Sequence, residues 1–202
     1  NDMFGIGIIG CGLIGKKRAN SLGDKGNLIA CADINLENAK KLARDFNAIA
    51  TDSWEEILKI DTIDIIIVST LHNSLSNITK SAIQHGKHVL VEKPAGRSYE
   101  EIEEVLPELS KSDLKVRVGF NHRYHPAILK AKEIIESGDL GELMFLRARY
   151  GHGGRLGYEK EWRADPNKSG GGEIIDQGSH LIDLSRMFLG DFSNIKGLAH
   201  TF

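Results

Sequence analysis

The stretch that decides the fold is GIIGCGLIGKKRA, residues 7–19. Its glycines Gly10, Gly12 and Gly15 have the spacing Gly-x-Gly-x-x-Gly, directly after a β-branched run and at the start of a helical pattern. The first glycine makes a tight turn, the second lets the backbone approach a pyrophosphate, and the third allows close packing of helix on strand. The amide groups of the helix N-terminus favour the same anion. Because the spacing alone also fits an ordinary turn, its context must decide.

The sequence around this turn predicts a doubly wound parallel Rossmann sheet. Short β-branched runs alternate with helical patterns up to Phe120. Runs that are apolar on both faces, with helices between them, indicate a parallel sheet covered on both sides. Six strands with five crossovers are typical of the dinucleotide-binding fold. The expected strands are 4–10, 28–33, 48–50, 63–70, 87–94 and 114–120, and the expected helices are 13–22, 36–46, 53–59, 74–85 and 98–110.

The pattern changes after Phe120. We expect a helix within 125–141, a strand at 142–151, a Gly-rich charged loop at 151–172, a further helix, and a strand at 194–202. Two strands bury too little to make an independent domain. We therefore expect an α/β protein with a dinucleotide-binding domain at 1–121. Residues 122–202 are expected to be the beginning of an α+β substrate or oligomerisation domain that is truncated.

Composition excludes several classes of function. The 202 residues carry a net charge of -2 that is dispersed along the chain, which gives no sign of a nucleic-acid or membrane surface. No apolar run approaches the ~18 residues of a membrane span, and no secretory signal is visible. Cys11 and Cys31 form no disulfide framework, so we expect a cytoplasmic protein. The histidine pairs at 85/88 and 122/125 lack the spacing of a zinc site, so no metal is expected.

Asp33 ends the second expected strand, 18 residues beyond Gly15. An acid at this position can accept hydrogen bonds from the hydroxyls of an adenosine ribose and would repel a 2′-phosphate. The following residues, 34–38, contain no arginine to bind such a phosphate. NAD is therefore favoured over NADP. The alternative is a carboxylate that only satisfies backbone amides at the start of the next helix.

Glu92, Lys93 and Pro94 leave the carboxyl end of a buried strand, where open α/β sheets bind their ligands. Pro94 stops the strand and restricts the backbone of Lys93. The lysine could then hydrogen-bond a substrate hydroxyl or share its proton. A surface lysine is the alternative interpretation.

The stretch GGGEIIDQGSHLIDL, residues 170–184, carries the third motif. On an α-helix Asp176, His180 and Asp183 would fall within about 60° of one another, opposite an apolar arc. Histidine suits general acid/base chemistry because its unperturbed pKa lies near neutrality, and an acid one turn earlier could orient it or bind a neighbouring hydroxyl. Asp183 is expected to be structural. A solvent-facing polar side of the helix is the competing explanation.

These residues together resemble the Gfo/Idh/MocA family of NAD(P)-dependent sugar and inositol oxidoreductases. The resemblance covers nearly the whole chain and rests on the glycine turn, Asp33, Glu92-Lys93-Pro94 and residues 170–184. It implies that Lys93 is catalytic, that Asp176 and His180 are catalytic residues on the substrate side, and that the complete second domain ends in a broad antiparallel sheet used for oligomerisation. Trp162 and Arg163 also resemble a cofactor-contacting pair of some members.

One segment departs from the family pattern. After the fourth strand the family commonly has Thr-Pro-Asn-x-x-His, whereas residues 70–75 read TLHNSL, which makes the cofactor contacts there less secure. Lys93, Tyr124, Asp176 and His180 are the expected substrate contacts. The expected cofactor contacts are Gly10, Gly12, Leu13, Ile14, Gly15, Asp33, Thr70, His72, Glu92, Lys93, Asn121, Trp162 and Arg163.

The sequence therefore predicts an NAD-dependent dehydrogenase or reductase that moves a hydride at a ring carbon of a sugar, inositol or nucleotide-sugar. In this prediction His180 is the general acid/base, Lys93 assists at the same oxygen and Asp176 orients, and a complete second domain would form a homo-oligomer. Two alternatives remain: a dinucleotide-binding protein or redox sensor without turnover, and an S-adenosylmethionine-binding Rossmann protein. The latter would leave Lys93-Pro94 and the Asp176/His180 helix unexplained.

Overall fold

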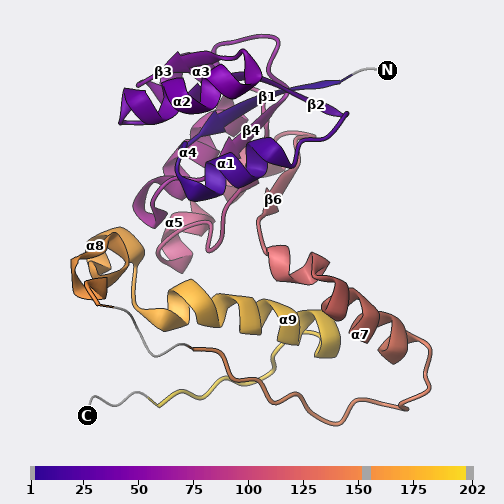
Figure 1. The fold of residues 1–202 in the computed structure, drawn as a ribbon. Helices are drawn as coiled ribbons and strands as arrows, with labels where there is room; N and C mark the ends of the chain where they lie inside the picture. Colours follow the sequence, from indigo (N-terminus) through magenta and orange to yellow (C-terminus); the bar gives the residue numbers. More distant parts are fainter. Residues whose placement is uncertain (1–2, 152–155, 199–202) are drawn as a thin grey trace. The chain divides into compact units, whose positions relative to one another are not determined.

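The computed structural model describes residues 3–151 and 156–198 (Figure 1). The chain divides into two compact units. The first comprises Asn1–Gly119 and Gly154–Asp176, and the second comprises Phe120–Gly153 and Gln177–Phe202. The sequence predicted a single boundary at 121/122. In the structure, residues 154–176 return to the first unit, which a single boundary does not include.

The first unit is built on a six-stranded parallel sheet in the order β3-β2-β1-β4-β5-β6, which confirms the predicted doubly wound fold. Its strands are β1 Phe4–Ile9, β2 Gly26–Ala32, β3 Ile49–Thr51, β4 Ile65–Val68, β5 His88–Val91 and β6 Val116–Val118. Its longer helices are α1 Leu13–Asn20, α2 Leu36–Phe46, α3 Trp54–Leu58, α4 His72–Gln84, α5 Tyr99–Glu103 and α6 Leu106–Ser110. The expected single helix over 98–110 is two short helices, because Pro107 favours the first turn of a new helix over the interior of an existing one.

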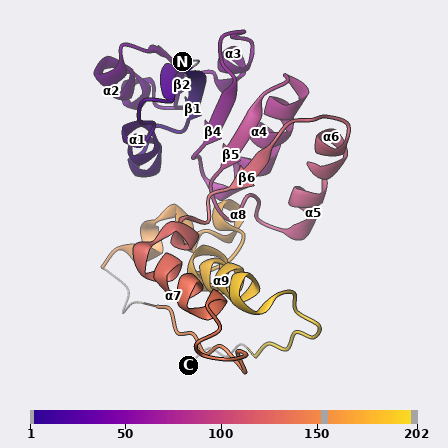
Figure 2. The ribbon, with the colours of Figure 1, turned by 90° about the vertical axis from the view of Figure 1, so that its right-hand side faces the viewer.

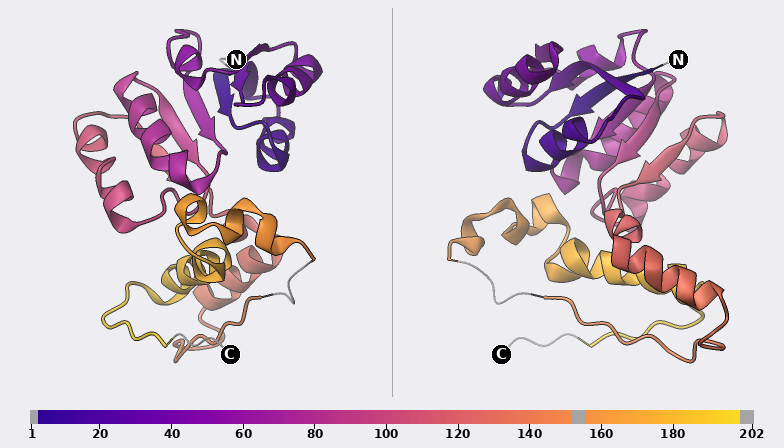
Figure 3. Two further views of the ribbon diagram at one scale, coloured as in Figure 1. Left: turned by 90° about the vertical axis from the view of Figure 1, so that its left-hand side faces the viewer. Right: turned by 45° about the vertical axis from the view of Figure 1, so that its right-hand side comes forward.

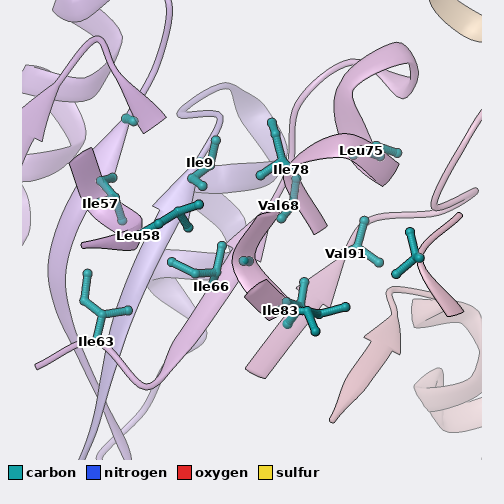
Figure 4. Packing of buried hydrophobic residues seen from close by; sticks show 14 of the residues in the cluster. Ile9, Ile57, Leu58, Ile63, Ile66, Val68, Leu75, Ile78, Ile83 and Val91 are labelled. Carbon is teal, nitrogen blue, oxygen red and sulfur yellow. The ribbon is translucent and has the colours of Figure 1, made fainter. Parts of the chain in front are cut away.

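Two apolar layers enclose the sheet. Helices α1 and α2 pack on one face, while α3 and α4 pack on the other, and Figure 2 shows α1 and α2 on the opposite side of the strands from α4. Alternate residues of one strand point to opposite layers: Ile66 and Val68 belong to the α3/α4 layer and Ile67 to the α1/α2 layer. Ile66 and Val68 are fully buried and pack with Ile57 and Leu75 (Figure 4). Burial on both faces explains why these strands lack polar alternation.

The return segment of the first unit contains three short elements: η2 Tyr158–Lys160, η3 Trp162–Ala164 and α8 Pro166–Ser169. Asp165 begins α8 by accepting a hydrogen bond from the Asn167 N–H, and Gly170 ends it with a positive φ of 82°. A π-helical turn, η4 Ile174–Gly178, follows and holds Asp176. The helical region therefore begins with a turn wider than the α-helix that we expected.

The second unit contains η1 Asn121–Tyr124, α7 Pro126–Glu136 and α9 Ser179–Leu189. Residues 142–151 and 194–198, which we expected to be in strands, form irregular chain with no strand (Figure 3). The β-branched and aromatic residues of these segments favour an extended backbone, but a strand also needs a neighbour to pair with its N–H and C=O groups. The remaining residues of the second expected strand, 199–202, lie outside the described residues.

Across the described ranges 3–151 and 156–198, no helix is both long enough and apolar enough to cross a membrane.

Candidate active site

The carboxyl ends of the strands meet in one row. Ala32, Ile9, Val68, Val91 and Val118 are register partners along the sheet. The residues that follow them therefore share one edge. These are Asp33, Gly10, Ser69, Glu92 and Gly119, so the register brings the glycine turn, the ribose acid and the Glu-Lys motif together at the edge where such sheets bind ligands.

The glycine turn has the geometry of a phosphate site. Gly10 has a φ of 95°, and a Cβ on Gly15 would lie 2.0 Å from the Gly10 carbonyl oxygen, so both positions require glycine. A Cβ on Gly12, by contrast, would meet no atom within 4 Å. Gly12 is the N-cap residue of α1 and supplies no side-chain cap to the amides of the first turn. The turn thus presents open backbone and a helix N-terminus, which fit the pyrophosphate of a dinucleotide.

Two exposed apolar side chains follow this turn. Leu13 is 71% exposed and Ile14 is 37% exposed, although they begin a helix whose other face packs on the sheet. Their exposure leaves apolar surface beside Gly12, as a bound dinucleotide would require.

Asp33 is held in place from two sides. One carboxylate oxygen accepts a hydrogen bond from the Cys11 N–H at 2.8 Å, and the other accepts one from the Asn35 N–H at 2.9 Å. Asp33 therefore satisfies backbone amides, as the alternative interpretation expected. The oxygen bonded to Asn35 also accepts from Asn38 Nδ2 at 3.5 Å, whereas the oxygen bonded to Cys11 can accept a second hydrogen bond, which leaves acceptor capacity for a ribose.

Glu92 and Thr70 also have protein partners at this edge. Glu92 accepts a hydrogen bond from Arg18 Nε of α1 at 2.5 Å, which ties the end of β5 to the helix that follows the glycine turn. The Thr70 hydroxyl accepts a hydrogen bond from the Ser74 hydroxyl at 2.8 Å. Ser69, which the sequence analysis did not single out, donates from its hydroxyl to the Gly10 carbonyl at 2.7 Å and so supports the turn.

Lys93 pairs with Asp176, a residue 83 positions later in the chain. Its ammonium donates to Asp176 Oδ1 at 2.5 Å and to the Asp176 carbonyl oxygen at 2.6 Å. Asp176 Oδ2 accepts from Arg163 Nε at 3.0 Å. The pair is largely desolvated, because the side chains of Lys93 and Asp176 are only 17% and 7% exposed. Three of the residues predicted from separate motifs thus form one charged cluster.

The charges around Asp176 control its ionisation. Burial acts to raise its pKa, but the hydrogen bond and charge of Lys93, with the charge of Arg163, outweigh burial and lower the pKa below the ordinary range. Asp176 is therefore a carboxylate at neutral pH and acts as an acceptor for the lysine ammonium.

His72 anchors the return segment to α4. Its Nδ1 lies 2.9 Å from the Ser169 carbonyl oxygen, so Nδ1 carries the proton and donates, and its ring meets Trp162 edge-on with centroids 4.7 Å apart. The His72 ring is 4% exposed. Burial lowers the pKa of His72 by more than the Ser169 carbonyl raises it, and the Lys93 charge acts in the same direction as burial. This histidine is a neutral donor that holds Ser169 and Trp162.

Two further contacts hold the same segment. The Arg97 guanidinium donates to the Asn167 carbonyl oxygen, and a Cβ on Gly170 would lie 2.6 Å from Arg97 Cβ. The first glycine of GGGEIIDQGSHLIDL therefore permits close approach to the chain just beyond the Lys93-Pro94 motif. Arg163 in turn stacks on Trp162, with its Cζ 4.5 Å from the ring centroid. Trp162 and Arg163 are thus in contact, and the arginine is directed to Asp176, while their role in cofactor binding stays a prediction.

In the second unit His180 lies on α9 and is 5% exposed. Its ring stacks on His122 of η1, with centroids 3.8 Å apart and planes inclined by 17°. Asp183 is also buried and accepts a bidentate pair from Arg123 at 2.7 and 2.6 Å, the structural role expected for it. Of the other residues predicted in η1, Asn121 is exposed and Tyr124 is 58% exposed.

The burial of this helix reverses the expected amphipathic pattern. Asp176, His180 and Asp183 are all buried, whereas Ile182 and Leu189 are 49% and 45% exposed. The competing explanation, in which Asp176, His180 and Asp183 form the solvent-facing side of a helix, is therefore wrong. Each of the three polar residues has a charged or aromatic partner from a distant part of the chain, which a helical-wheel pattern does not reveal.

Within the described residues, no group of three or more His, Cys, Asp or Glu side chains is placed to hold a metal ion.

A doubly wound parallel sheet with an open glycine turn at its ligand-binding edge is the architecture of a dinucleotide-binding Rossmann protein. Residues 4–120 match the family model described as the oxidoreductase family with an NAD-binding Rossmann fold, and residues 128–202 match the Gfo/Idh/MocA C-terminal domain. The chain belongs to the Gfo/Idh/MocA family.

Individual relatives agree with this assignment. Levoglucosan dehydrogenase of Pseudarthrobacter phenanthrenivorans is 29% identical over 182 residues, covering 85% of this chain and 45% of the relative. Glucose-6-phosphate 3-dehydrogenase of Bacillus subtilis is 31% identical over 183 residues, covering 89% and 52%. A solved levoglucosan dehydrogenase in complex with NADH and levoglucosan matches with a TM-score of 0.86 and 26% identity, covering 95% and 55%. The chain spans about half the length of the relatives that it matches.

The state of His72 makes the stability of the first unit pH-dependent. Because its folded-state pKa is lowered, the stabilisation that depends on neutral His72 is present above its unfolded pKa of about 6.5. It is lost as the pH falls from there through the lower folded-state pKa. We expect His72→Gln, which keeps an N–H donor but does not titrate, to flatten the fall in urea-unfolding free energy over this range. The control His85→Gln changes an exposed histidine and should leave the pH dependence of the unfolding free energy as in the wild type. The same pH dependence in His72→Gln as in the wild type would contradict this assignment.

Proposed function

We propose that the protein is an NAD-dependent dehydrogenase or reductase that acts on a secondary alcohol of a sugar, inositol or nucleotide-linked sugar. The single observation that carries the proposal is the Lys93–Asp176 pair, which lies at the ligand-binding edge of the sheet beside a dinucleotide turn. The names of the relatives, which include levoglucosan dehydrogenase and glucose-6-phosphate 3-dehydrogenase, support a polyhydroxylated substrate.

The residues divide the work as follows. The turn made by Gly10, Gly12 and Gly15 holds the pyrophosphate through the open backbone at Gly12 and the N-terminus of α1, and Asp33 accepts from the ribose hydroxyls. NAD, when bound, supplies the hydride acceptor for alcohol oxidation. Lys93 donates two of its three ammonium hydrogens to Asp176, so its orientation is fixed, and the third can be donated to the substrate oxygen.

The hydroxyl proton needs an acceptor as the alcohol is oxidised. We propose His180 as the general base, because histidine is the side chain whose unperturbed pKa lies nearest neutrality. Lys93 stabilises the negative charge that develops on the same oxygen. Asp176, whose oxygens accept from Lys93 and Arg163, acts by holding the lysine rather than by taking the proton. We also propose that the protein acts in the cytoplasm.

Asp33 should make the chain prefer NADH over NADPH, because its carboxylate repels a 2′-phosphate. Unfavourable placement of like charges costs several kcal/mol, so we expect NADH to bind at least about tenfold more tightly in a fluorescence titration. Asp33→Asn should reduce this ratio, whereas Glu37→Gln, which removes an exposed carboxylate paired with Lys40, should leave it unchanged. Equal affinities in the wild type would contradict the proposed role of Asp33.

Catalysis can be tested by assaying a panel of sugars and inositols with NAD. We expect Lys93→Met and His180→Asn to lower kcat on the responsive substrate by about 10²–10⁴-fold, the range typical of general acid/base residues. Lys59→Met and His85→Asn change exposed residues of the same types and should leave kcat unaltered. Full activity in both site variants would refute the assigned roles. NADH binding without turnover of any substrate would favour a non-catalytic dinucleotide-binding protein.

A further inference from the structure

His122 lies against the proposed general base but has no role in the mechanism described above. It belongs to η1, whereas His180 belongs to α9, and the two rings are nearly parallel with centroids 3.8 Å apart. The short distance between the ring centroids and the small angle between the ring planes together mean that one imidazole covers a face of the other. Its sequence neighbour His125, in contrast, caps α7 by accepting from the Ala127 N–H.

An ion pair fixes the two elements that carry the stack. Arg123 directly follows His122, and Asp183 lies one helical turn after His180. Arg123 Nε and Nη2 donate to the two carboxylate oxygens of Asp183 at 2.7 and 2.6 Å. Because a bidentate arginine–carboxylate pair constrains both distance and orientation, it holds η1 against α9 at the position of the stack.

Two other aromatic rings surround the stacked histidines. Phe120 meets His180 edge-on, with centroids 6.0 Å apart and planes inclined by 81°. Tyr150 meets His122 at 5.8 Å and 60°. The His180 ring therefore has a ring face on one side and a ring edge on another, all from the second unit.

We propose that His122 is a positioning residue for His180. By stacking, His122 sets the plane of the His180 imidazole and disfavours a positive charge on that ring. The importance of this for catalysis rests on the proposed function, in which a neutral His180 takes the hydroxyl proton. The stacking and the coupling between the charges are properties of the protein without cofactor or substrate.

The charges in the second unit explain the coupling. Among the described residues, the charged and titratable groups on these elements include His122, Arg123 and Tyr124 on η1 and Asp183 and Arg186 on α9. The 142–151 segment adds Glu142, Arg147, Arg149 and Tyr150. Arg123 and Asp183 largely compensate each other as a close pair. Stacked imidazoles at 3.8 Å cannot both carry a positive charge without strong repulsion, so protonation of one disfavours protonation of the other.

The test is an NMR pH titration of the histidine rings in the ligand-free chain, with ¹³C and ¹⁵N labels assigned by single substitutions. We expect His180 in the wild type to titrate over a broad range in two coupled steps. In His122→Phe, which keeps a stacking ring but removes its charge, His180 should titrate in one step with its midpoint at higher pH and its ring signals still sharp. In His122→Ala the midpoint should also rise, and the ring signals should broaden.

The proposal is overturned if His180 has the same titration curve in the wild type and in His122→Phe. The exposed control, His85→Gln, should leave the His180 curve unchanged. If His122→Ala does not fold, the phenylalanine variant still decides the result. Because neither cofactor nor substrate is used, this outcome is independent of the activity assay, so failure of the proposed function and failure of the positioning role are distinguishable.

Discussion

The contact between the Lys93 ammonium and Asp176 organises the rest of the candidate site. It joins the end of β5 to a segment that follows more than fifty residues of intervening chain and that contains Trp162 and Arg163. Both charged groups are largely removed from water, and such a pair is costly to break because either partner would remain as an isolated buried charge. The pair thus constrains the lysine and also fixes where the helix of the GGGEIIDQGSHLIDL stretch begins.

Several supporting contacts make this constraint possible. His72 and Arg97 hold the backbone of residues 167–169, and Gly170 allows the chain to pass close to Arg97. The turn that carries Asp176 is π-helical, a form that is often found at functional sites and that widens the backbone locally. The side chain at 176 therefore reaches Lys93 while the following α-helix carries His180 in the second unit.

The sheet was predictable because its determinants are local. The apolar runs and the turn at Gly10 and Gly15 act within a few residues, and Asp33 can be recognised from its place at the end of β2. Burial of Asp176, His180 and Asp183 was not predictable, because it depends on Lys93, His122 and Arg123, which are distant in sequence. The expected strands at 142–151 and 194–202 relied on side-chain propensity, whereas strand formation also depends on pairing partners that no local pattern identifies.

The most direct test of the account is a double-mutant cycle in urea unfolding with Lys93→Met, Asp176→Asn and the double variant. We predict a coupling free energy between the two positions toward the upper end of the roughly 0.5–3 kcal/mol range found for residues in one hydrogen-bond or salt-bridge network. The exposed pair Lys130–Glu133 should give only about 0.2–1 kcal/mol in the same experiment. Additivity of the Lys93 and Asp176 substitutions to within about 0.5 kcal/mol would contradict the claim that this ion pair organises the site.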